Sequence, residues 1–305
     1  MLRYDFVKKG VCALLFGVLL LSAGCERSGD CPEYKEGIRV GGLKASFITE
    51  TSGIATSRQN SGVFWIHNDS GDSAKLYAIK RNGELIGTYI VLGAGARDWE
   101  DIAIGPGPEA GSDYLYIGDI GDNGNRRKFV TVYRVLEPKV EEGESGYTKS
   151  TDKAERIRLK YPGGSANAET LIVDPASGDI YIITKSALVT KVFRASYPQS
   201  TSKVTLMEEV GSIDLIEATA GDISHDGKLV IVKNKNKVIL WVREPGSALS
   251  DVFSKAYCRV PVIPFIFEFQ GEAVCFDSDG LGYYTIGEGL YPSIFYFEAA
   301  KKIED

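Results

Sequence analysis

The sequence predicts an all-β protein that forms a single β-propeller, most simply one of five blades. The chain has 305 residues, of which 44% are hydrophobic, and its 34 Gly, 16 Tyr and 13 Phe accompany many Val, Ile and Thr residues. This composition favours strands over helices. Five similar segments begin at positions 52, 100, 169, 220 and 272, which is close to the period of about 40 to 50 residues of a four-stranded propeller blade.

Each repeated segment combines two strands. A small or acidic residue precedes a short apolar strand, and a Gly or Asp turn leads to a second strand rich in β-branched and aromatic residues. The pairs are Ser52–Thr56 with Val63–His67, Glu100–Ile104 with Tyr114–Gly118, Glu169–Val173 with Ile180–Thr184, Ala220–Ser224 with Leu229–Lys233, and Glu272–Phe276 with Gly282–Ile286. Six blades are the alternative, because one degenerate unit could hide in the longer connections. A β-sandwich would explain the strand density but not the repeat.

Third and fourth strands complete the units. The third strands are Lys75–Lys80, Val130–Arg134, Lys191–Arg194, Val238–Val242 and Ser293–Phe297, and the fourth are Glu84–Val91, Ala154–Lys160, Lys203–Glu209 and a strand within Val252–Val262. The fifth unit has no room for a fourth strand, so we expect Ile38–Leu43 to close the ring from the N-terminal side, which removes exposed sheet edges. The polar segment Glu137–Lys153 is predicted to be a solvated excursion.

The N-terminus carries an export signal. Lys8 and Lys9 precede an apolar run from Val11 to Leu21, which is shorter than the roughly 20 residues of a membrane-spanning helix and indicates a signal peptide. The segment Leu21–Cys25 resembles the bacterial lipobox, with Ser22 where leucine is most usual. This resemblance implies cleavage before Cys25 and lipidation of its thiol; a plain secretory signal is the alternative.

The resulting organisation places the mature protein in the cell envelope. We expect a lipoprotein signal peptide at 1–24, the lipidated Cys25 and a tether at 25–37, the propeller at 38–300 and a tail at 301–305. Glu26 follows the lipidated position, and in the sorting signals that it resembles a residue other than Asp implies the outer membrane of a Gram-negative host.

Charge restricts the partners. The net charge is −6, and removing residues 1–24, which carry a net +2, leaves −8 on the mature chain. The mature region has no dense basic stretch, so nucleic acid is excluded as a partner. We expect a monomer that is held at the membrane through Cys25 and binds a small molecule or an envelope protein.

Three cysteines remain after Cys12 leaves with the signal and Cys25 is lipidated. They are Cys31, Cys258 and Cys275, and an oxidising compartment permits one disulfide among them. Cys258 with Cys275, and Cys31 with either of the two, are all open. No CxxC or HxxxH spacing indicates a zinc site.

Acidic residues gather at one mouth of the predicted channel. Inner strands begin, and second strands end, on the same face of a propeller because neighbouring strands are antiparallel. Inner-strand starts carry Glu50, Asp98, Glu100, Asp101, Glu169, Asp222 and Glu272, and second-strand ends carry His67, Asn68, Asp69, Asp72, Asp119, Asp122, Asn123, Lys185, Lys233, Lys235 and Glu288. Crowded carboxylates repel one another unless a cation is bound.

These oxygen donors suit a divalent cation, Ca²⁺ in first place. The candidate metal ligands are Glu100, Glu169, Glu272, Asp69, Asp119 and Asp122, and the candidate ligand-binding residues are Asn68, Asp72, Trp99, Asn123, Lys185 and Glu288. Two alternatives remain open. The lysines can neutralise the acids, and Asn, Asp and Gly are ordinary turn formers.

Nucleophilic catalysis has little support in the sequence. The GxSxG motif is absent, as are the phosphate-binding glycine motifs. Glu100 and His67 are the candidates for a catalytic base, and a structural hydrogen bond is the alternative role for His67.

Four segments carry a family resemblance. Trp99–Ala103, Gly118–Asn123, Ser52–Ala55 and Gly271–Val274 resemble secreted bacterial β-propeller proteins of unassigned activity, and the likeness covers nearly all of residues 38–300. More loosely, the chain is similar to the SdiA-regulated, NHL-type and gluconolactonase/regucalcin propellers. The last resemblance implies a channel metal held by a glutamate (Glu100, Glu169 or Glu272), an asparagine (Asn68 or Asn123) and an aspartate (Asp69, Asp119 or Asp122).

Together these features predict a lipid-anchored binding or scaffold module of the cell envelope. The alternative is a metal-dependent hydrolase of a lactone or phosphoester, in which the cation polarises the scissile group and a carboxylate is the base.

Overall fold

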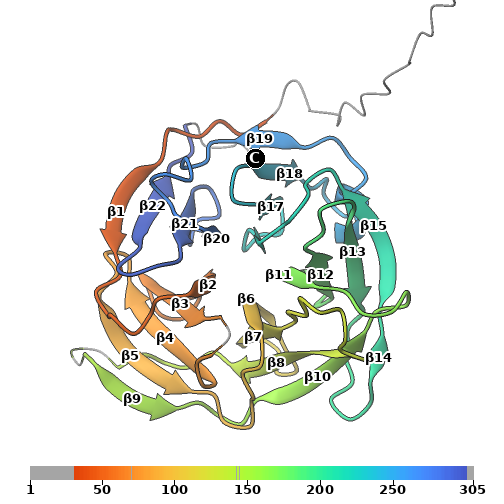
Figure 1. Cartoon of the computed structure of the whole chain (residues 1–305), viewed down its shortest axis with the longest axis horizontal. Helices are drawn as coiled ribbons and strands as arrows, with labels where there is room; N and C mark the ends of the chain where they lie inside the picture. Colours follow the sequence, from red (N-terminus) through yellow and green to blue (C-terminus); the bar gives the residue numbers. More distant parts are fainter. Residues whose placement is uncertain (1–30, 70, 142, 144, 301–305) are drawn as a thin grey trace, which may run out of the picture.

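A computed structural model describes residues 31–300 except 70, 142 and 144. The signal peptide, Cys25 and the 301–305 tail of the predicted organisation lie outside the described residues. Five antiparallel sheets surround a common centre (Figure 1), so the chain is a five-bladed β-propeller. The described part contains one short helix, α1 (Leu249–Val252), and no helix in it is long and apolar enough to cross a membrane.

The blades follow one another along the chain, and each begins with its innermost strand. Blade one is β2 (Thr51–Thr56), β3 (Val63–Asn68), β4 (Lys75–Lys80) and β5 (Leu85–Ile90); blade two is β6 (Trp99–Pro106), β7 (Asp113–Asp119), β8 (Val130–Leu136) and β10 (Glu155–Lys160). Blade three is β11 (Ala168–Val173), β12 (Ile180–Thr184), β13 (Thr190–Ala195) and β15 (Glu208–Ile213); blade four is β16 (Ala220–Ile223), β17 (Leu229–Lys233), β18 (Val238–Val242) and β19 (Cys258–Val260).

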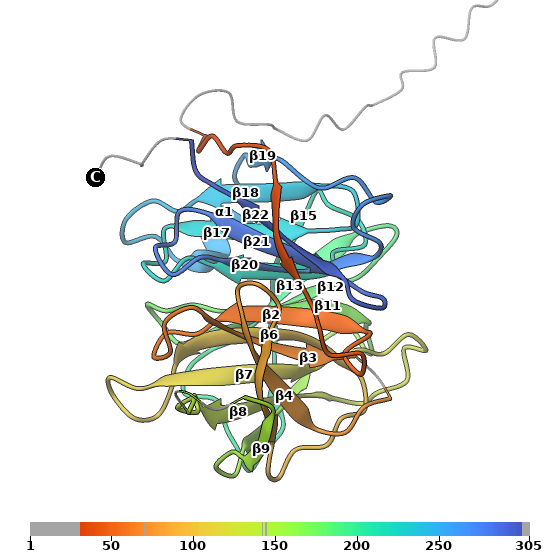
Figure 2. The same ribbon diagram turned by 90° about the vertical axis from the view of Figure 1, so that its left-hand side faces the viewer.

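Blade five is completed from the other end of the chain. It contains β20 (Gly271–Phe276), β21 (Tyr283–Gly287) and β22 (Ser293–Phe297), and β1 (Ile38–Gly42) pairs antiparallel with β22 as the outermost strand. The predicted N-terminal closure is therefore confirmed. Figure 2 shows β1 running beside blade five from the region of β19 toward blade one.

Two predicted connections have a different structure. The segment Glu137–Lys153, predicted as a solvated excursion, contains β9 (Tyr147–Ser150), which pairs in parallel with β5 as a fifth strand of blade one. Glu137, at the start of this segment, is buried. The Glu137 carboxylate accepts a hydrogen bond from Trp65 Nε1 at 2.8 Å, which satisfies a buried indole. The expected fourth strand Lys203–Glu209 is also wrong, because β14 (Thr205–Leu206) joins blade two and β15 is the outer strand of blade three.

The hydrophobic core lies in the five seams between neighbouring blades. Each of the five clusters of buried apolar side chains combines residues of two adjacent blades. Both faces of a blade are covered in this way, so β12 and β17 are buried along their whole length and their sequences are continuously apolar rather than alternating. Trp65 and Trp241 are core residues.

A disulfide fastens the N-terminal segment to the ring. Cys31 is bonded to Cys258 at the start of β19, and the free Cys275 is buried in β20. Among the pairings that the sequence leaves open, the structure selects the one that links blade four to the strand closing blade five. Tyr34 also forms a bridge with Ala299.

We call the face on which inner strands begin and second strands end the mouth face, and the other the opposite face. Since β20, β21, β22 and β1 are successively antiparallel, β1 starts on the opposite face. The N-terminal segment from Cys31 therefore reaches the ring on the opposite face.

Candidate functional site

Three glutamates occupy the same position at the start of inner strands on the mouth face. Glu100, Glu169 and Glu272 are the second residues of β6, β11 and β20. Each coincides with a shift in the pairing register, as does Ser52 in β2. A bulge of this kind redirects a side chain, which explains how alternating strands present a glutamate at the same place in three blades.

Two of these glutamates have lysine partners. Lys185, which follows β12, lies 2.6 Å from Glu169, and Lys235, which follows β17, lies 2.9 Å from Glu272. Burial raises the pKa of Glu169 to about 7, although Lys185 opposes the rise. Burial also opposes ionisation of Glu272, but hydrogen bonds from Glu288 and Lys235 outweigh it and lower the pKa of Glu272.

Glu100 differs because its neighbours are acids. Its carboxylate lies in a group with those of Asp69 and Asp98, whose candidate ligand atoms are all within 4.8 Å of one another. Burial, followed by the charges of Glu169, Asp69 and Asp98, raises the pKa of Glu100 to about 11. Burial also raises the pKa of Asp98. Among the described residues Glu100 has no ion-pair partner, so no cationic side chain holds its carboxyl group in the ionised form.

The backbone leaves room for this group. Asp98 precedes β6, and Gly121 follows β7 with its N–H donating to the Asp98 carbonyl at 3.2 Å. A Cβ at Gly121 would stand 2.1 Å from Glu100 Oε1 and 2.5 Å from Asp98 Oδ2. Only glycine at 121 is compatible with both carboxylates at this place.

Asn68 and Asp72 hold the loop that carries Asp69. The Asn68 side chain accepts from the Glu50 N–H at 3.2 Å and donates to Phe47 O and to Asp72 Oδ2 at 3.0 and 3.1 Å. Asp72 also accepts hydrogen bonds from Tyr77 and Lys75. These two predicted ligand-binding residues position Asp69 within the chain.

Asp119 and Asp122 are engaged in the loop of blade two. Asp119 forms an ion pair of 2.8 Å with the buried Arg127, and Asp122 accepts the backbone N–H groups of Arg126 and Arg127 at 3.0 and 2.7 Å. Asn123 accepts a hydrogen bond from Asn167. These predicted site residues are therefore engaged by Arg126, Arg127 and Asn167 within and beside their own loop.

His67 and Trp99 are corrected by their burial. His67 is fully buried, which lowers its pKa to about 4, and its Nδ1 is 2.9 Å from the Asn68 carbonyl oxygen. The Trp99 indole is 1% exposed, packs edge-on against His67 and donates to Gly95 O. Neither ring is accessible to a ligand, so His67 does not retain its predicted role as a catalytic base, nor Trp99 its predicted role in ligand binding.

Asp101 and Asp222 join inner strands rather than line the mouth. Asp101 accepts the N–H of Leu171, and Asp222 that of Phe276, at 2.9 and 2.8 Å. Each carboxylate therefore links its strand to an inner strand of another blade.

Glu288 is hydrogen-bonded to Glu272 at the blade-five side of the mouth. Burial and the hydrogen bond with Glu272 raise the pKa of Glu288 to about 8, and Gln270 donates to its carboxylate. Lys233, which ends β17, is completely buried and donates to the Gly271 carbonyl. Lys233 is therefore a link between blades four and five.

The grouping of Asp69, Asp98 and Glu100 was only partly visible in the sequence. The sequence predicts Asp98 as a mouth residue but does not indicate that it lies beside Glu100. The signal that identifies the group is the residue that follows the second strand, which is Lys185 in blade three and Asp69 in blade one. Blade one therefore has an acid at the position where blade three has the lysine that pairs with Glu169.

Comparisons with known proteins support no family assignment. No protein-family model matches the chain, and neither does any curated protein sequence. Among solved structures, a PQQ-bound aldose sugar dehydrogenase from Streptomyces coelicolor is similar with 10% identity and a TM-score of 0.46, over 88% of this chain and 99% of that one. A candidate 6-phosphogluconolactonase from Bacteroides uniformis is similar with 16% identity and a TM-score of 0.40, over 83% of this chain and 69% of that one.

Proposed function

We propose that this protein is a lipid-anchored β-propeller of the cell envelope that binds a divalent cation, Ca²⁺ in first place, at Asp69, Asp98 and Glu100. A polar ligand is then recruited to the mouth face through the cation. The observation that carries the proposal is that Glu100 lies among acids and has no lysine partner, whereas Glu169 and Glu272 at the equivalent positions each have one.

The donor set fits a hard cation. Carboxylate oxygens are the ligands that Ca²⁺ prefers, and Ca²⁺ takes about six to eight oxygens. Three carboxylates leave several of these to be supplied by water or by a ligand. The cation would also offset the repulsion that Asp69 and Asp98 exert on the Glu100 carboxylate.

Calorimetric titration of the full chain carrying Cys25→Ser, which avoids lipid and detergent, tests the cation site. We expect Ca²⁺ binding below millimolar concentration and a loss of at least about tenfold in affinity in Glu100→Gln, because even an outer partner of a metal ligand contributes that much. Glu272→Gln is the matched control, since it removes the equivalent glutamate from a site that already contains Lys235, and its affinity should change little.

Binding should also release a proton. The pKa of Glu100 is raised to about 11 without a cation, so the cation must displace that proton, and affinity should increase as pH rises from 6 to 9. Absence of binding, or equal losses in the two variants, would refute the site.

The anchor is a separate part of the proposal. The lipobox-like segment ending at Cys25 supports attachment to the membrane. The unmodified protein should fractionate with membranes and incorporate labelled palmitate, and Cys25→Ser should abolish both. A labelled Cys25→Ser protein would contradict lipidation at this residue.

Metal-dependent hydrolysis is the second candidate function, and the environment of Glu169 favours it. Its pKa of about 7 suits a general base that exchanges protons near neutral pH. Lactones, phosphoesters and nucleotides are the substrates to assay with added Ca²⁺. Inactivity on all of them, with cation binding established, would leave the binding module.

A further inference from the structure

Exposed apolar side chains are concentrated on the mouth face. Loops that enter inner strands or leave second strands contain most of the large apolar residues that are exposed among the described residues. The densest group is Phe265, Ile266, Phe267 and Phe269 before β20, with Leu290 and Tyr291 after β21. Ile266, Phe267 and Leu290 are 81%, 66% and 65% exposed. Contiguous apolar surface of this kind indicates an interaction site.

A groove runs between these two loops. It has a volume of about 360 Å³ and is lined by Phe267, Phe269, Leu290 and Tyr291 together with Glu268 and Glu288. The loops are joined at its base, because the N–H of Glu288 donates to Phe269 O at 3.2 Å. A Cβ at Gly287 would lie 2.3 Å from Phe269 O, so glycine permits this close approach. The groove is therefore built into the ring.

The polar lining of the groove is acidic and incompletely satisfied. Glu268 is 4% exposed, and its Oε1 has no hydrogen-bond partner among the described residues. Its Oε2 is 3.6 Å from Lys233, whose ammonium also bonds to Gly271. A buried carboxylate oxygen without a donor favours a ligand that brings one. Glu288 adds a second carboxyl at the same groove.

We propose that the groove between residues 265–269 and 288–293 binds a segment of another protein in which apolar side chains adjoin a lysine or arginine. The apolar side chains of the partner pack on Phe267 and Leu290, and its cation contacts Glu268 and Glu288. This site is independent of the proposed cation site at Glu100.

Two other occupants fit less well. The first is a lipid membrane. The N-terminal segment reaches the ring on the opposite face, so a membrane attached through this segment would lie on the side away from the groove. A second copy of this chain would bring one carboxyl-lined groove against another, which supplies no cation for the Glu268 oxygen that has no hydrogen-bond partner among the described residues. The lining of the groove therefore favours a basic segment of a different protein.

Selection from a random 12-residue peptide library displayed on phage tests the proposal, with the full chain carrying Cys25→Ser as the immobilised target. We expect enriched peptides to combine Leu, Ile, Phe or Trp with Lys or Arg. The affinity of these peptides for the target should fall at least about tenfold, or 1.4 kcal/mol, when their basic residue is replaced by Glu. An equal loss is expected when the target carries Phe267→Ser together with Leu290→Ser. These side chains are exposed, so the variant should fold.

Leu206→Ser is the matched control, since Leu206 is a similarly exposed apolar residue on β14 and lies outside the groove. Binding should persist in EDTA and in Glu100→Gln, which separates this site from the cation site. Peptides without a basic residue, unchanged affinity in the double variant, or no enrichment would overturn the proposal. So would binding to phosphatidylcholine vesicles, or self-association that the double variant abolishes, because these identify lipid or a second copy as the occupant.

Discussion

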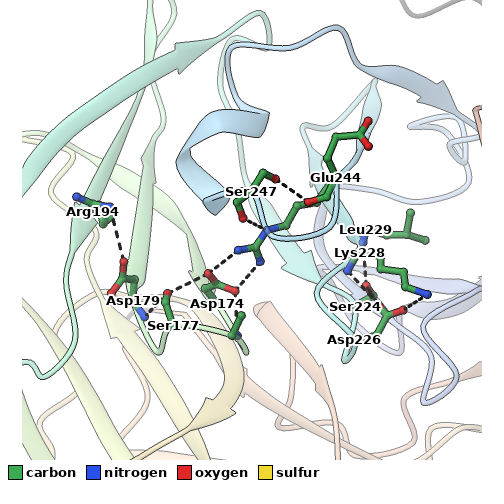
Figure 3. A network of polar contacts seen from close by, with 12 residues as sticks. Asp174, Ser177, Asp179, Arg194, Ser224, Asp226, Lys228, Leu229, Glu244 and Ser247 are labelled. Atoms are coloured by element: carbon green, nitrogen blue, oxygen red, sulfur yellow. Dashed lines mark hydrogen bonds and ion pairs between the residues drawn. The ribbon is translucent and has the colours of Figure 1, made fainter.

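The two faces of the ring use acidic residues in opposite ways. On the opposite face, Asp174 in the turn after β11 contacts both Arg243 terminal nitrogens at 2.8 and 3.2 Å and accepts a hydrogen bond from Ser177 (Figure 3). Asp226, in the equivalent turn of blade four, accepts hydrogen bonds from Ser224 and Lys228. These acids are satisfied by their surroundings, as is usual for turn residues.

On the mouth face, the corresponding local satisfaction is incomplete. Asp119 and Asp122 are neutralised or capped within their own loop, whereas Asp69, Asp98 and Glu100 face one another. Acidity in a loop is therefore a weak sign of a binding site by itself, and the grouping of several carboxylates in space is a stronger one. Removing the charge of Asp174 and removing that of Glu100 should therefore change stability in opposite directions.

The largest effect is expected from the disulfide that joins the N-terminal segment to blade four. Cys31→Ser opens a cross-link between residues 227 apart in sequence, which should lower the free energy of unfolding by about 4–5 kcal/mol through the gain in unfolded-chain entropy. Urea unfolding measures the change. Reductant should destabilise the unmodified protein similarly and leave the variant unchanged, and cation affinity at the mouth should persist. Equal stability of the two proteins would show that pairing of β1 with β22 suffices for closure.

A somewhat smaller loss is expected for Asp174→Asn. The variant leaves the Arg243 guanidinium, whose side chain is 11% exposed, without its counter-charge, and breaking such a buried pair lowers stability by about 3–5 kcal/mol. Asp226→Asn is the control, because its pair with Lys228 is 53% exposed on both sides and should change stability by about 0.5 kcal/mol or less. Similar losses in both variants would contradict a special role for the Asp174 pair.

The smallest change in the free energy of unfolding, counted per pH unit, is expected from Glu100. Here the ionised carboxylate destabilises the fold, in contrast to Asp174. With its pKa raised to about 11, folded Glu100 keeps a proton that the unfolded chain releases above about pH 4.5. In EDTA, the unfolding free energy should therefore fall by up to about 1 kcal/mol per pH unit as pH rises from 5 to 9. Glu100→Gln removes this dependence and stabilises the protein at pH 8.

Glu272→Gln provides the contrast for the same measurement. The pKa of Glu272 is lowered, so its ionised form stabilises the fold above its unfolded pKa, and that contribution is lost as pH falls through the folded pKa. At pH 8 this variant should be the less stable one. Parallel pH profiles for Glu100→Gln and the unmodified protein would show that Glu100 is not protonated in the fold.

Much of the architecture was predictable because it depends on local pattern. The inner and second strands recur with the spacing of a blade, and their continuous apolar character reflects burial on both sides. The two strands that the sequence pattern does not predict correctly are also explained by local properties. Thr205–Leu206 and Tyr147–Ser150 are short and mostly exposed, so no periodic pattern indicates which blade they join.

The candidate site was less predictable, since equivalent acids differ only in their partners. Glu100, Glu169 and Glu272 occupy the same place in their strands, but Lys235 meets Glu272 from the neighbouring blade. Arg127 removes Asp119 from the site by an ion pair within its loop. No spacing in the sequence distinguishes these cases, because the folded ring decides which charged side chains come into contact.

The sequence by itself determined the propeller, the closure by Ile38–Leu43 and the acidity of one mouth, because strand period, turn chemistry and residue type are properties of neighbouring residues. The folded ring sets the pairing of Cys31 with Cys258, the burial of His67 and Trp99, and the grouping of Glu100 with Asp69 and Asp98. These outcomes depend on which side chains of distant blades come within contact, and only the packing of the ring sets those distances.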